Sequence, residues 1–507
     1  MMKFKKNTLA SKMGLALALL GAVAMAPTIS ADDDDDRDDG DRGALFIMTN
    51  SATSLRGNEV TMYDRAENGD LNLVGSFPTG RLTEDGPQIG SGPSATVQVF
   101  SLATNGVLPF VSAQADSLGS SDSLILSENN KCLFAVNAGA NSITSFRVRD
   151  DGLRIASIVD SRGVFPNSLA LSKRVLYVLN NGDQGNIAGY RVGKRCSLSP
   201  LTDDNSDIVD LTGISESFPI PAPGETITTP SHISFSPDGE HLALAVKGLD
   251  GAAFDDDGNL LSLPDGSMAI FPVSDRDSSL GEPTITRFDF AGGAGGPFSF
   301  QFADDDTVIV THANSTSIGA YTLNDDDTLS LNEGGLIPVD SFATCWLDMK
   351  KGEDGNDTFV YASSFGIPSR VKEIVGLGSG IPPTDGLISG FRINDDGSLD
   401  DLNTHTSYPD PSVLLGKDAT GNHGIDVQVI GDYLYFLQPR VGMIGRLTID
   451  REDGSLSNLV NIAGQAPGLE PFATLNPGVD NFLDRCYLAD DPAAECELGS
   501  IQGIAGF

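Results

Sequence analysis

A single hexapeptide pattern recurs along this chain and constrains its fold more than any other feature. The pattern is an apolar residue, two residues of any kind, an aromatic residue, one residue of any kind and an aliphatic residue. Full copies begin at Ile143, Ile187, Met268, Ile318 and Ile388, and copies that lack one of the three marked positions begin at Val60 and Ile444. Such self-similarity indicates that one supersecondary unit has been repeated. Because an alternating apolar strand cannot bury its face alone, the repeated units must stack on one another.

Each copy lies in the same order of parts. An alternating apolar strand, such as 168–172, leads through a tight turn to a denser apolar strand, and the hexapeptide strand follows after a short loop. A hairpin rich in Asp and Gly, such as 394–397, comes next, and these residues suit the positive-φ positions of hairpin turns. Four antiparallel strands in each of seven units predict an all-β chain folded as a seven-bladed β-propeller. Insertions are expected at 80–118, 200–228, 249–266 and 366–385.

The predicted propeller covers residues 44–475. Its first blade begins at a second strand, Leu45–Met48, so the innermost strand of that blade must come from elsewhere in the chain. Residues 469–475 resemble the start of an innermost strand in their proline and apolar positions. We therefore expect a C-terminal strand at 469–475 to close the ring, and residues 476–507 to form a tail.

The first 31 residues have the pattern of a secretory signal peptide. A basic stretch with four lysines precedes a short apolar stretch from Leu15 to Met25, and Ala31 ends the preferred cleavage site. Residues 32–43 form an acidic block that cannot pack, and we expect a disordered, solvated tether there. No later stretch is long and apolar enough to predict a membrane-spanning helix. The sequence therefore predicts an exported protein, periplasmic or extracellular.

Charge and motif content limit the expected partners and cofactors. The chain carries a formal net charge of −38, and such a surface repels nucleic acid and anionic membranes. Neither is expected as a partner, a small anionic molecule stays open as a ligand, and the sequence does not identify a protein partner. No phosphate-binding loop occurs, and no histidine pair has a spacing that implies a metal site. We therefore expect no cofactor and no metal.

The chain has five cysteines, and an odd count in an exported protein leaves at least one thiol unpaired. Cys486 and Cys496 flank a short loop near the C-terminus, and we expect them to form a disulfide in an oxidising compartment. Cys132 and Cys345 lie in apolar strand patterns, so we expect both to be small buried side chains.

Three stretches carry a resemblance to a known family. Residues 133–143 read Leu-Phe-Ala-Val-Asn-Ala-Gly-Ala-Asn-Ser-Ile, and the Ser-Pro-Asp-Gly turn at 236–239 and the Thr-Cys-Trp triplet at 344–346 fit the same pattern. The chain resembles the bacterial lactonase family of seven-bladed propellers, which includes 6-phosphogluconolactonases and carboxymuconate cyclases, and would be a secreted member. The resemblance covers about residues 44–475. It implies the propeller fold and a funnel on one face that is lined by His, Arg and Glu at strand ends.

This resemblance implies a catalytic role for one residue and also contains departures. His232 stands where the family has a histidine, and the resemblance therefore implies His232 as the catalytic acid or base. Asn167 occupies the position of a second family histidine, and Lys247 occupies that of a glutamate. Ser231 and Phe298 occupy the positions of two arginines. Only His232 of these five positions therefore keeps the family residue.

Strand order brings further candidates to the rim on which His232 is expected. His312 ends a second strand and His423 precedes a first strand, and these two kinds of strand end meet on one rim of a propeller. Lys247 and Arg440 would add positive charge there for an anionic substrate. The candidate substrate-binding residues are Lys247, His312, His423, Asn167 and Arg440.

Each candidate also has a simpler explanation. A polar residue at a strand end often lies there only because the chain meets water at that point. Lys247 and Arg440 have many acidic residues with which to pair, and an exposed ion pair of that kind has little functional meaning. From the sequence alone, these simpler explanations stay open for every candidate.

Two functions follow from these residues. Opening or closing a lactone needs a proton donor or acceptor and a positive group for the carboxylate or oxyanion. We expect an exported lactonase-like propeller that hydrolyses or forms a small anionic lactone, of the 6-phosphogluconolactonase or carboxymuconate cyclase type. The alternative is a non-catalytic secreted propeller that binds a ligand, a cation or a protein partner, and the departures at family positions favour it. Convergence of His232, Lys247 and His312 in one pocket would favour the enzyme.

Overall fold

In the computed structural model, the chain divides into two units, residues 1–40 and Asp41–Phe507, and the following account concerns the second unit. The described residues are 43–50, 58–80, 118–214, 218–219, 226–227, 230–248, 253–254, 260–262, 265–289, 291–341, 343–352, 357–364, 386–407, 424–438, 443–463 and 500–507. The predicted signal peptide and residues 32–42 of the predicted acidic tether lie outside these residues, whereas Gly43, expected to end the tether, begins the first strand.

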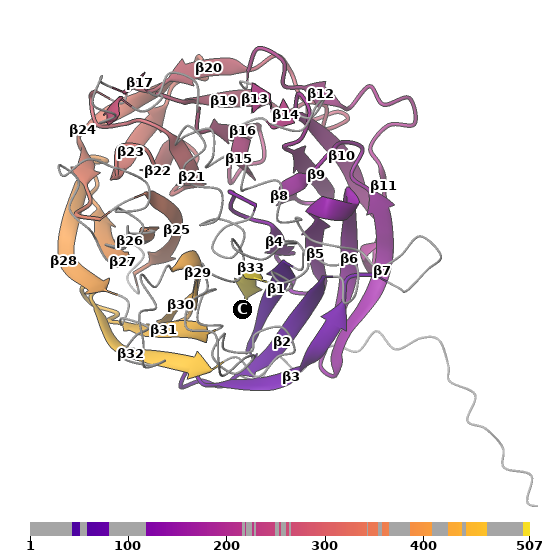
Figure 1. Ribbon diagram of the computed structural model, residues 1–507, viewed down its shortest axis with the longest axis horizontal. Coiled ribbons are helices and arrows are strands. Elements are labelled where there is room, and N and C mark those ends of the chain that lie inside the picture. Colours follow the sequence, from indigo (N-terminus) through magenta and orange to yellow (C-terminus); the bar gives the residue numbers. More distant parts are fainter. Residues whose placement is uncertain are drawn as a thin grey trace, which may run out of the picture. The chain divides into compact units, whose positions relative to one another are not determined.

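Seven antiparallel sheets, each built on four strands, make up the second unit (Figure 1). From the innermost strand outwards, blade one consists of β33 (Ser500–Gly506), β1 (Gly43–Asn50), β2 (Glu59–Arg65) and β3 (Leu71–Pro78). Blade two consists of β4 (Leu124–Leu126), β5 (Cys132–Asn137), β6 (Ser142–Arg149) and β7 (Gly152–Asp160). Blade three consists of β8 (Pro166–Ser172), β9 (Val175–Asn180), β10 (Asn186–Val192) and β11 (Leu198–Pro200), and β12 (Val209–Asp210) also pairs with β10.

The other four blades have the same order. Blade four consists of β15 (Pro230–Phe235), β16 (His241–Val246), β19 (Ser267–Pro272) and β20 (Thr284–Arg287). Blade five consists of β21 (Pro297–Phe302), β22 (Thr307–His312), β23 (Ser317–Leu323) and β24 (Leu329–Pro338). Blade six consists of β25 (Thr344–Lys351), β26 (Thr358–Ser364), β27 (Leu387–Ile393) and β28 (Leu399–Ser407), and blade seven of β29 (Ile425–Ile430), β30 (Tyr433–Gln438), β31 (Met443–Ile449) and β32 (Leu456–Ala463).

Short elements decorate the loops between these strands. Two of the predicted insertions contain two-stranded hairpins, β13 (Phe218–Pro219) with β14 (Thr226–Ile227) and β17 (Ala253–Phe254) with β18 (Leu260–Ser262). Two 3₁₀-helices, η1 (Ala138–Ala140) and η2 (Lys194–Cys196), follow strands of blades two and three. The innermost strands of successive blades contact one another, including those of blades seven and one, so the seven sheets form a ring.

The predicted seven-bladed propeller is confirmed, and the hexapeptide marks the same strand in every blade. Each copy begins on the third strand from the centre, as in β6 and β10, and its marked apolar positions are buried except Val273 and Ile393, which are half-buried. The second strand is buried more completely, because Leu133, Phe134, Ala135 and Val136 of β5 alternate between two faces that are both covered. Full burial of a Leu or Phe side chain contributes roughly 1.5–3 kcal/mol.

A C-terminal strand closes the ring, as expected, but it is a different segment from the one predicted. β33 pairs antiparallel with β1, and Phe46 stands opposite Ala505. The segment 469–475 lies outside the described residues, and the propeller extends beyond residue 475 to β33. The prediction missed β33 because its Gly-rich sequence lacks the proline and the strong alternation that mark other innermost strands.

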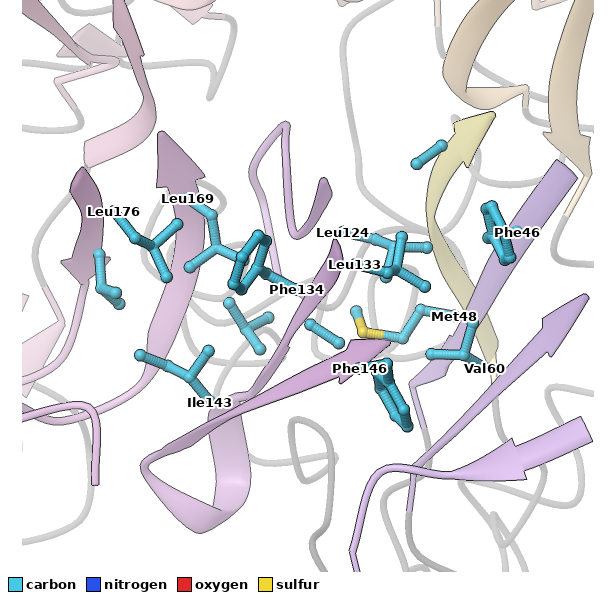
Figure 2. Close-up of a cluster of buried hydrophobic side chains, with 14 of the residues drawn as sticks. Phe46, Met48, Val60, Leu124, Leu133, Phe134, Ile143, Phe146, Leu169 and Leu176 are labelled. Atoms are coloured by element: carbon cyan, nitrogen blue, oxygen red, sulfur yellow. The ribbon is translucent and has the colours of Figure 1, made fainter. Parts of the chain in front are cut away.

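The core lies between the blades. One cluster joins Phe46 and Met48 of blade one, Phe134 and Phe146 of blade two, and Leu176 of blade three. Figure 2 shows these side chains between the ribbons of neighbouring blades. Phe146 is the aromatic residue of a hexapeptide, so the recurring pattern supplies the side chains that hold one blade against the next.

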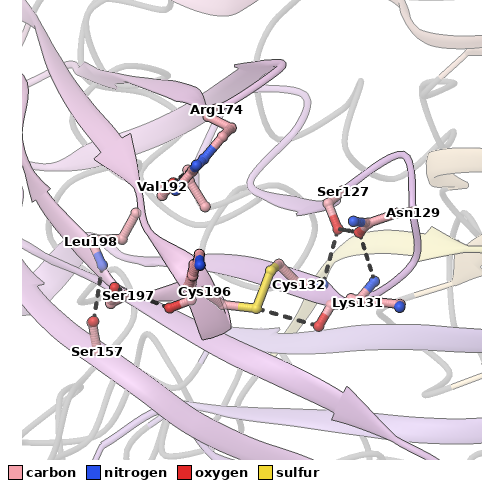
Figure 3. Close-up of a disulfide and its surroundings, with 11 residues drawn as sticks. Ser127, Asn129, Lys131, Cys132, Ser157, Arg174, Val192, Cys196, Ser197 and Leu198 are labelled. Carbon is pink, nitrogen blue, oxygen red and sulfur yellow. Dashed lines mark hydrogen bonds between the residues drawn. A yellow bond between two sulfur atoms is a disulfide. The ribbon is translucent and has the colours of Figure 1, made fainter. Parts of the chain in front are cut away.

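A disulfide joins blades two and three. Cys132 at the start of β5 is bonded to Cys196 in η2, as Figure 3 shows. The expectation that Cys132 is only a small buried side chain is therefore wrong, because η2 brings a partner that is distant in sequence. The expectation for Cys345 is confirmed, since its side chain is buried. The predicted Cys486–Cys496 disulfide lies outside the described residues.

Replacing both Cys132 and Cys196 with Ser is expected to lower the free energy of unfolding by about 3 kcal/mol, because the cross-link restricts the unfolded chain across a long loop. The loop spans a sequence separation of 64. Urea unfolding of the wild type and the variant measures this difference. Cys345→Ala is the control and should cost clearly less, because it removes a buried sulfur but no cross-link. Equal unfolding free energies for the double variant and the wild type would contradict the prediction.

Candidate functional site

A short segment before β4 crosses the centre of the ring. This axial segment, Leu118–Ser123, is bonded to innermost strands of several blades. Ser120 donates its hydroxyl to the carbonyl of Asn167 in blade three, and the Ser121 amide donates to the carbonyl of Ser231 in blade four. The indole Nε1 of Trp346 in blade six donates to the carbonyl of Ser120 at 3.1 Å. Because blades three and six are not neighbours, a segment that contacts both must lie across the centre of the ring.

His232 is hydrogen-bonded to Asp122 of the axial segment. Its Nε2 lies 2.9 Å from Oδ2 of Asp122, and the side chain of His232 is 2% exposed whereas that of Asp122 is 43% exposed. The ring of His232 also packs on Phe300, with a centroid distance of 4.6 Å. The predicted catalytic histidine is therefore buried at the centre of the ring, and its acidic partner faces solvent.

The tautomer of His232 follows from its second hydrogen bond. The backbone amide of Phe300 donates to Nδ1 of His232 at 3.2 Å. Because a nitrogen that accepts a hydrogen bond carries no proton, the neutral ring carries its proton on Nε2 and donates it to Asp122. The amide of Phe300 is directed to the ring beside a β-bulge in β21, where the register with β22 shifts between Pro297 and Phe300. Both ring nitrogens of His232 are therefore engaged.

Lys247 reaches the same axial segment. Its ammonium Nζ donates to the carbonyl of Gly119 at 2.6 Å and lies 4.9 Å from the centre of the Phe298 ring. Phe298 in turn packs edge-on against Trp346. The structure thus brings Lys247 and His232 to one segment, with the lysine charge held by a carbonyl dipole and an aromatic face.

His312 lies elsewhere, inside the packing between blades four and five. Its Nε2 accepts a hydrogen bond from, or donates one to, the hydroxyl of Tyr321 at 2.8 Å, and its ring packs against Phe288. The side chain is fully buried, and within the described part of the chain its contacts do not reach the axial segment. Burial lowers the pKa of His312 to about 3, so the ring is neutral at ordinary pH.

Of the other predicted site residues, Asn167 is among the described residues. Asn167 is fully buried and donates its side-chain amide to the carbonyl of Pro230 in the next blade at 3.2 Å. His423 and Arg440 lie outside the described residues. Of the predicted set, the structure therefore brings His232, Lys247 and Asn167 around the axial segment.

Asp348 is a second carboxylate near the centre, which the sequence reasoning missed. Its Oδ1 accepts hydrogen bonds from the side chain of Gln301 in blade five and from the backbone amide of Met349. Its Oδ2 accepts hydrogen bonds from the side chain of Gln428 and the backbone amide of Val429, both in blade seven. Burial raises the pKa of Asp348 to about 6, and the charge of Asp122 also raises it. Both oxygens are occupied, so Asp348 ties together three innermost strands.

Asp122 was also missed, for an identifiable reason. It lies only four residues beyond the predicted insertion 80–118, and nothing in its neighbourhood resembles a site motif. Its partner His232 is 110 residues further along the chain. The structure gives Asp122 a φ of 58°, a conformation in which Asp is favoured over most other residues, but the sequence does not show that angle.

Comparison with known proteins gives likenesses of fold. No family model matches the chain, and no curated protein matches it. Among solved structures, a Bacteroides uniformis protein provisionally assigned as a 6-phosphogluconolactonase is 16% identical with a TM-score of 0.53, over 83% of this chain and 97% of that chain. The periplasmic gluconolactonase of Pseudomonas aeruginosa is 15% identical with a TM-score of 0.51, over 83% of this chain and 97% of that chain.

A protein from Lactobacillus plantarum is similar to the same degree, with 14% identity and a TM-score of 0.51, over 84% of this chain and 97% of that chain. At identities this low, these likenesses show the seven-bladed propeller fold and no more. Among the described residues, no helix has the length and apolar character needed to cross a membrane.

The buried neutral state of His312 predicts a pH dependence of stability. The unfolded chain takes up a proton at His312 near the ordinary pKa of about 6.5, whereas the folded chain does so only near 3. This residue therefore contributes its full stability above pH 6.5 and loses it as the pH falls towards 3, at about 1 kcal/mol per pH unit.

In urea unfolding between pH 4 and 7, His312→Gln should remove this contribution, because Gln does not titrate while it can still bond to Tyr321. The stability difference between the wild type and the variant should shrink as the pH falls. A difference that stays constant with pH would contradict the assignment of a buried neutral ring.

Proposed function

We propose that this protein is an exported lactonase-like propeller that hydrolyses or forms a small anionic lactone, of the 6-phosphogluconolactonase or carboxymuconate cyclase type. The observation that carries the proposal is the pair of Asp122 and His232 at the centre of a propeller. A carboxylate and an imidazole within hydrogen-bond distance provide the proton-transfer group that lactone opening or closing needs. The shared fold with the periplasmic gluconolactonase of Pseudomonas aeruginosa supports the proposal.

Export is supported by two independent observations. Residues 1–31 have the pattern of a signal peptide. The Cys132–Cys196 disulfide belongs to a kind of bond that persists in oxidising compartments and is rare in the cytosol. We therefore infer a periplasmic or extracellular location.

The cationic part of the proposed site is Lys247. Its ammonium lies on the same axial segment as Asp122, and a positive group there would attract the carboxylate of a lactone acid. His423 and Arg440 stay in the proposal as further substrate-binding residues. His312 and Asn167 are fully buried, so neither presents side-chain surface to a substrate in this conformation, and the proposed mechanism does not use them.

A non-catalytic binding propeller is the second candidate, and specific observations favour it. The axial segment lies across the centre of the ring, and both ring nitrogens of His232 are engaged by protein groups. Asn167 and Ser231, which replace family residues, donate hydrogen bonds to the next blade. A ligand, a cation or a protein partner would then bind one face of the ring without being transformed.

Hydrolysis of a panel of lactones distinguishes the two functions. The panel includes 6-phosphogluconolactone, gluconolactone and carboxymuconolactone, and the proteins are the wild type, His232→Ala and His241→Ala. We expect His232→Ala to lower kcat/KM by about 100-fold or more, because it removes one member of the proton-transfer pair. His241→Ala should keep the wild-type value, since His241 pairs with Asp327 between blades four and five.

Thermal unfolding of all three proteins shows whether a loss of activity reflects a loss of fold. Wild-type protein that hydrolyses none of the lactones, or a folded His232→Ala protein with full activity, would overturn the enzymatic proposal and leave the binding propeller.

A further inference from the structure

Asp122 and His232, the hydrogen-bonded pair at the centre, differ in how accessible their side chains are to a ligand. Asp122 Oδ2 accepts the hydrogen bond from His232, and Oδ1 makes no hydrogen bond with the part of the chain that the structure describes. The Asp122 side chain is 43% exposed and that of His232 is 2% exposed. A substrate can therefore reach a carboxylate oxygen of Asp122 but neither nitrogen of His232.

His232 is held in one orientation by groups that do not titrate. The amide of Phe300 donates to Nδ1, and the Phe300 ring packs on the imidazole. His232 is therefore oriented so that its Nε2 points at Asp122.

Asp122 is held equally firmly through its backbone. Its carbonyl accepts from the amide of Leu169 in blade three at 2.9 Å, and the amide of the preceding Ser121 is bonded to Ser231 in blade four. The φ angle of 58° lies in the left-handed region that few non-glycine residues adopt. Such conformations persist where the surrounding structure determines them, and they cluster at functional sites.

The carboxylate of Asp348 differs from that of Asp122 in its hydrogen bonds and in its burial. Four donors fill its two oxygens, and it is buried among blades five, six and seven. Asp348 has no oxygen left to take a proton from a water molecule. Compared with Asp348, Asp122 has a more exposed side chain and an oxygen, Oδ1, that makes no hydrogen bond with the described part of the chain.

We propose that Asp122 is the catalytic general base of this propeller and that His232 is its positioning residue. This inference rests on the lactonase function proposed above and reverses the roles expected from the sequence. Asp122 Oδ1 takes a proton from water as the water oxygen bonds to the lactone carbonyl carbon. The ring carbon–oxygen bond then breaks, and the proton passes from Asp122 to the leaving oxygen, which gives a hydroxy acid with no change of oxidation state. His232 keeps its Nε2 proton throughout and orients the carboxylate.

The test is Asp122→Gly with added formate. Glycine adopts a φ of 58° without strain, so this variant should fold while it lacks the carboxylate. On the lactone that the wild type hydrolyses fastest, we expect kcat to fall by about 100-fold or more, with KM changed far less. Formate supplies a carboxylate to the vacated space, and we expect it to restore kcat by about tenfold, an effect that a purely structural role would not produce.

Asp327→Gly is the matched control. Asp327 also has a left-handed backbone, with a φ of 61°, and also accepts from a histidine, His241, but it lies in a hairpin of blade five. Its variant should retain wild-type kcat and show no response to formate. His232→Gln tests positioning, because the Gln amide can still donate to Asp122, so it should retain more kcat than His232→Ala.

The outcomes separate this inference from the function on which it rests. An inactive wild type overturns both proposals. An active wild type with a fully active Asp122→Gly protein overturns the role of Asp122 alone. A folded, inactive Asp122→Gly protein that formate does not restore also overturns it, because the residue would then act only through structure. Loss of activity with rescue by formate supports the assignment.

Discussion

The structure depends on the need of every blade to cover both of its faces. The second strands carry apolar residues in an unbroken run, such as Leu133–Val136, and alternate side chains of a strand point to opposite sides. One blade cannot satisfy that run alone, so each must pack against two neighbours. The requirement passes from blade to blade until the ring closes. β33 closes it by pairing with β1, which otherwise would leave an open edge and an uncovered face in blade one.

Closing the ring also brings polar backbone groups together at its centre, and these need partners once they are buried. Ser120, Asn167, Ser231, Thr311 and Ser363 each donate a side-chain hydrogen bond to a carbonyl at the innermost strand of the next blade. The innermost strands of blades three to seven all shift register near their beginning, which turns these carbonyls towards the neighbour. Asn167 and Ser231 are two of these donors, and the resemblance noted in the sequence implied a histidine and an arginine at their positions. In this chain, the side chain at each of those positions donates a hydrogen bond that links its blade to the next one.

The same arrangement determines the candidate site. The axial segment enters the centre because Trp346, Asn167 and Ser231 offer it donors and acceptors from three blades. In consequence, Asp122 becomes the exposed partner of a buried histidine. The ammonium of Lys247 is held at the same axial segment by the carbonyl of Gly119 and the ring of Phe298. The charged groups near the centre therefore come from the segment before β4, from blade four and, with Asp348, from blade six, and not from a run of neighbouring residues in the chain.

The sequence by itself determined the repeating unit, the seven blades and the buried strands, because alternation and the hexapeptide are local patterns that the pleat of a strand makes visible. It also named His232 and Lys247 as candidates for one site, and both contact the axial segment. Only the tertiary structure decided that β33 closes the ring, that Cys132 pairs with Cys196, that His312 is buried between blades, and that Asp122 meets His232. Each of these contacts joins residues that are far apart in the chain. Such contacts depend on how the blades pack around a common centre, and a local periodicity in the sequence does not reveal which distant residues meet.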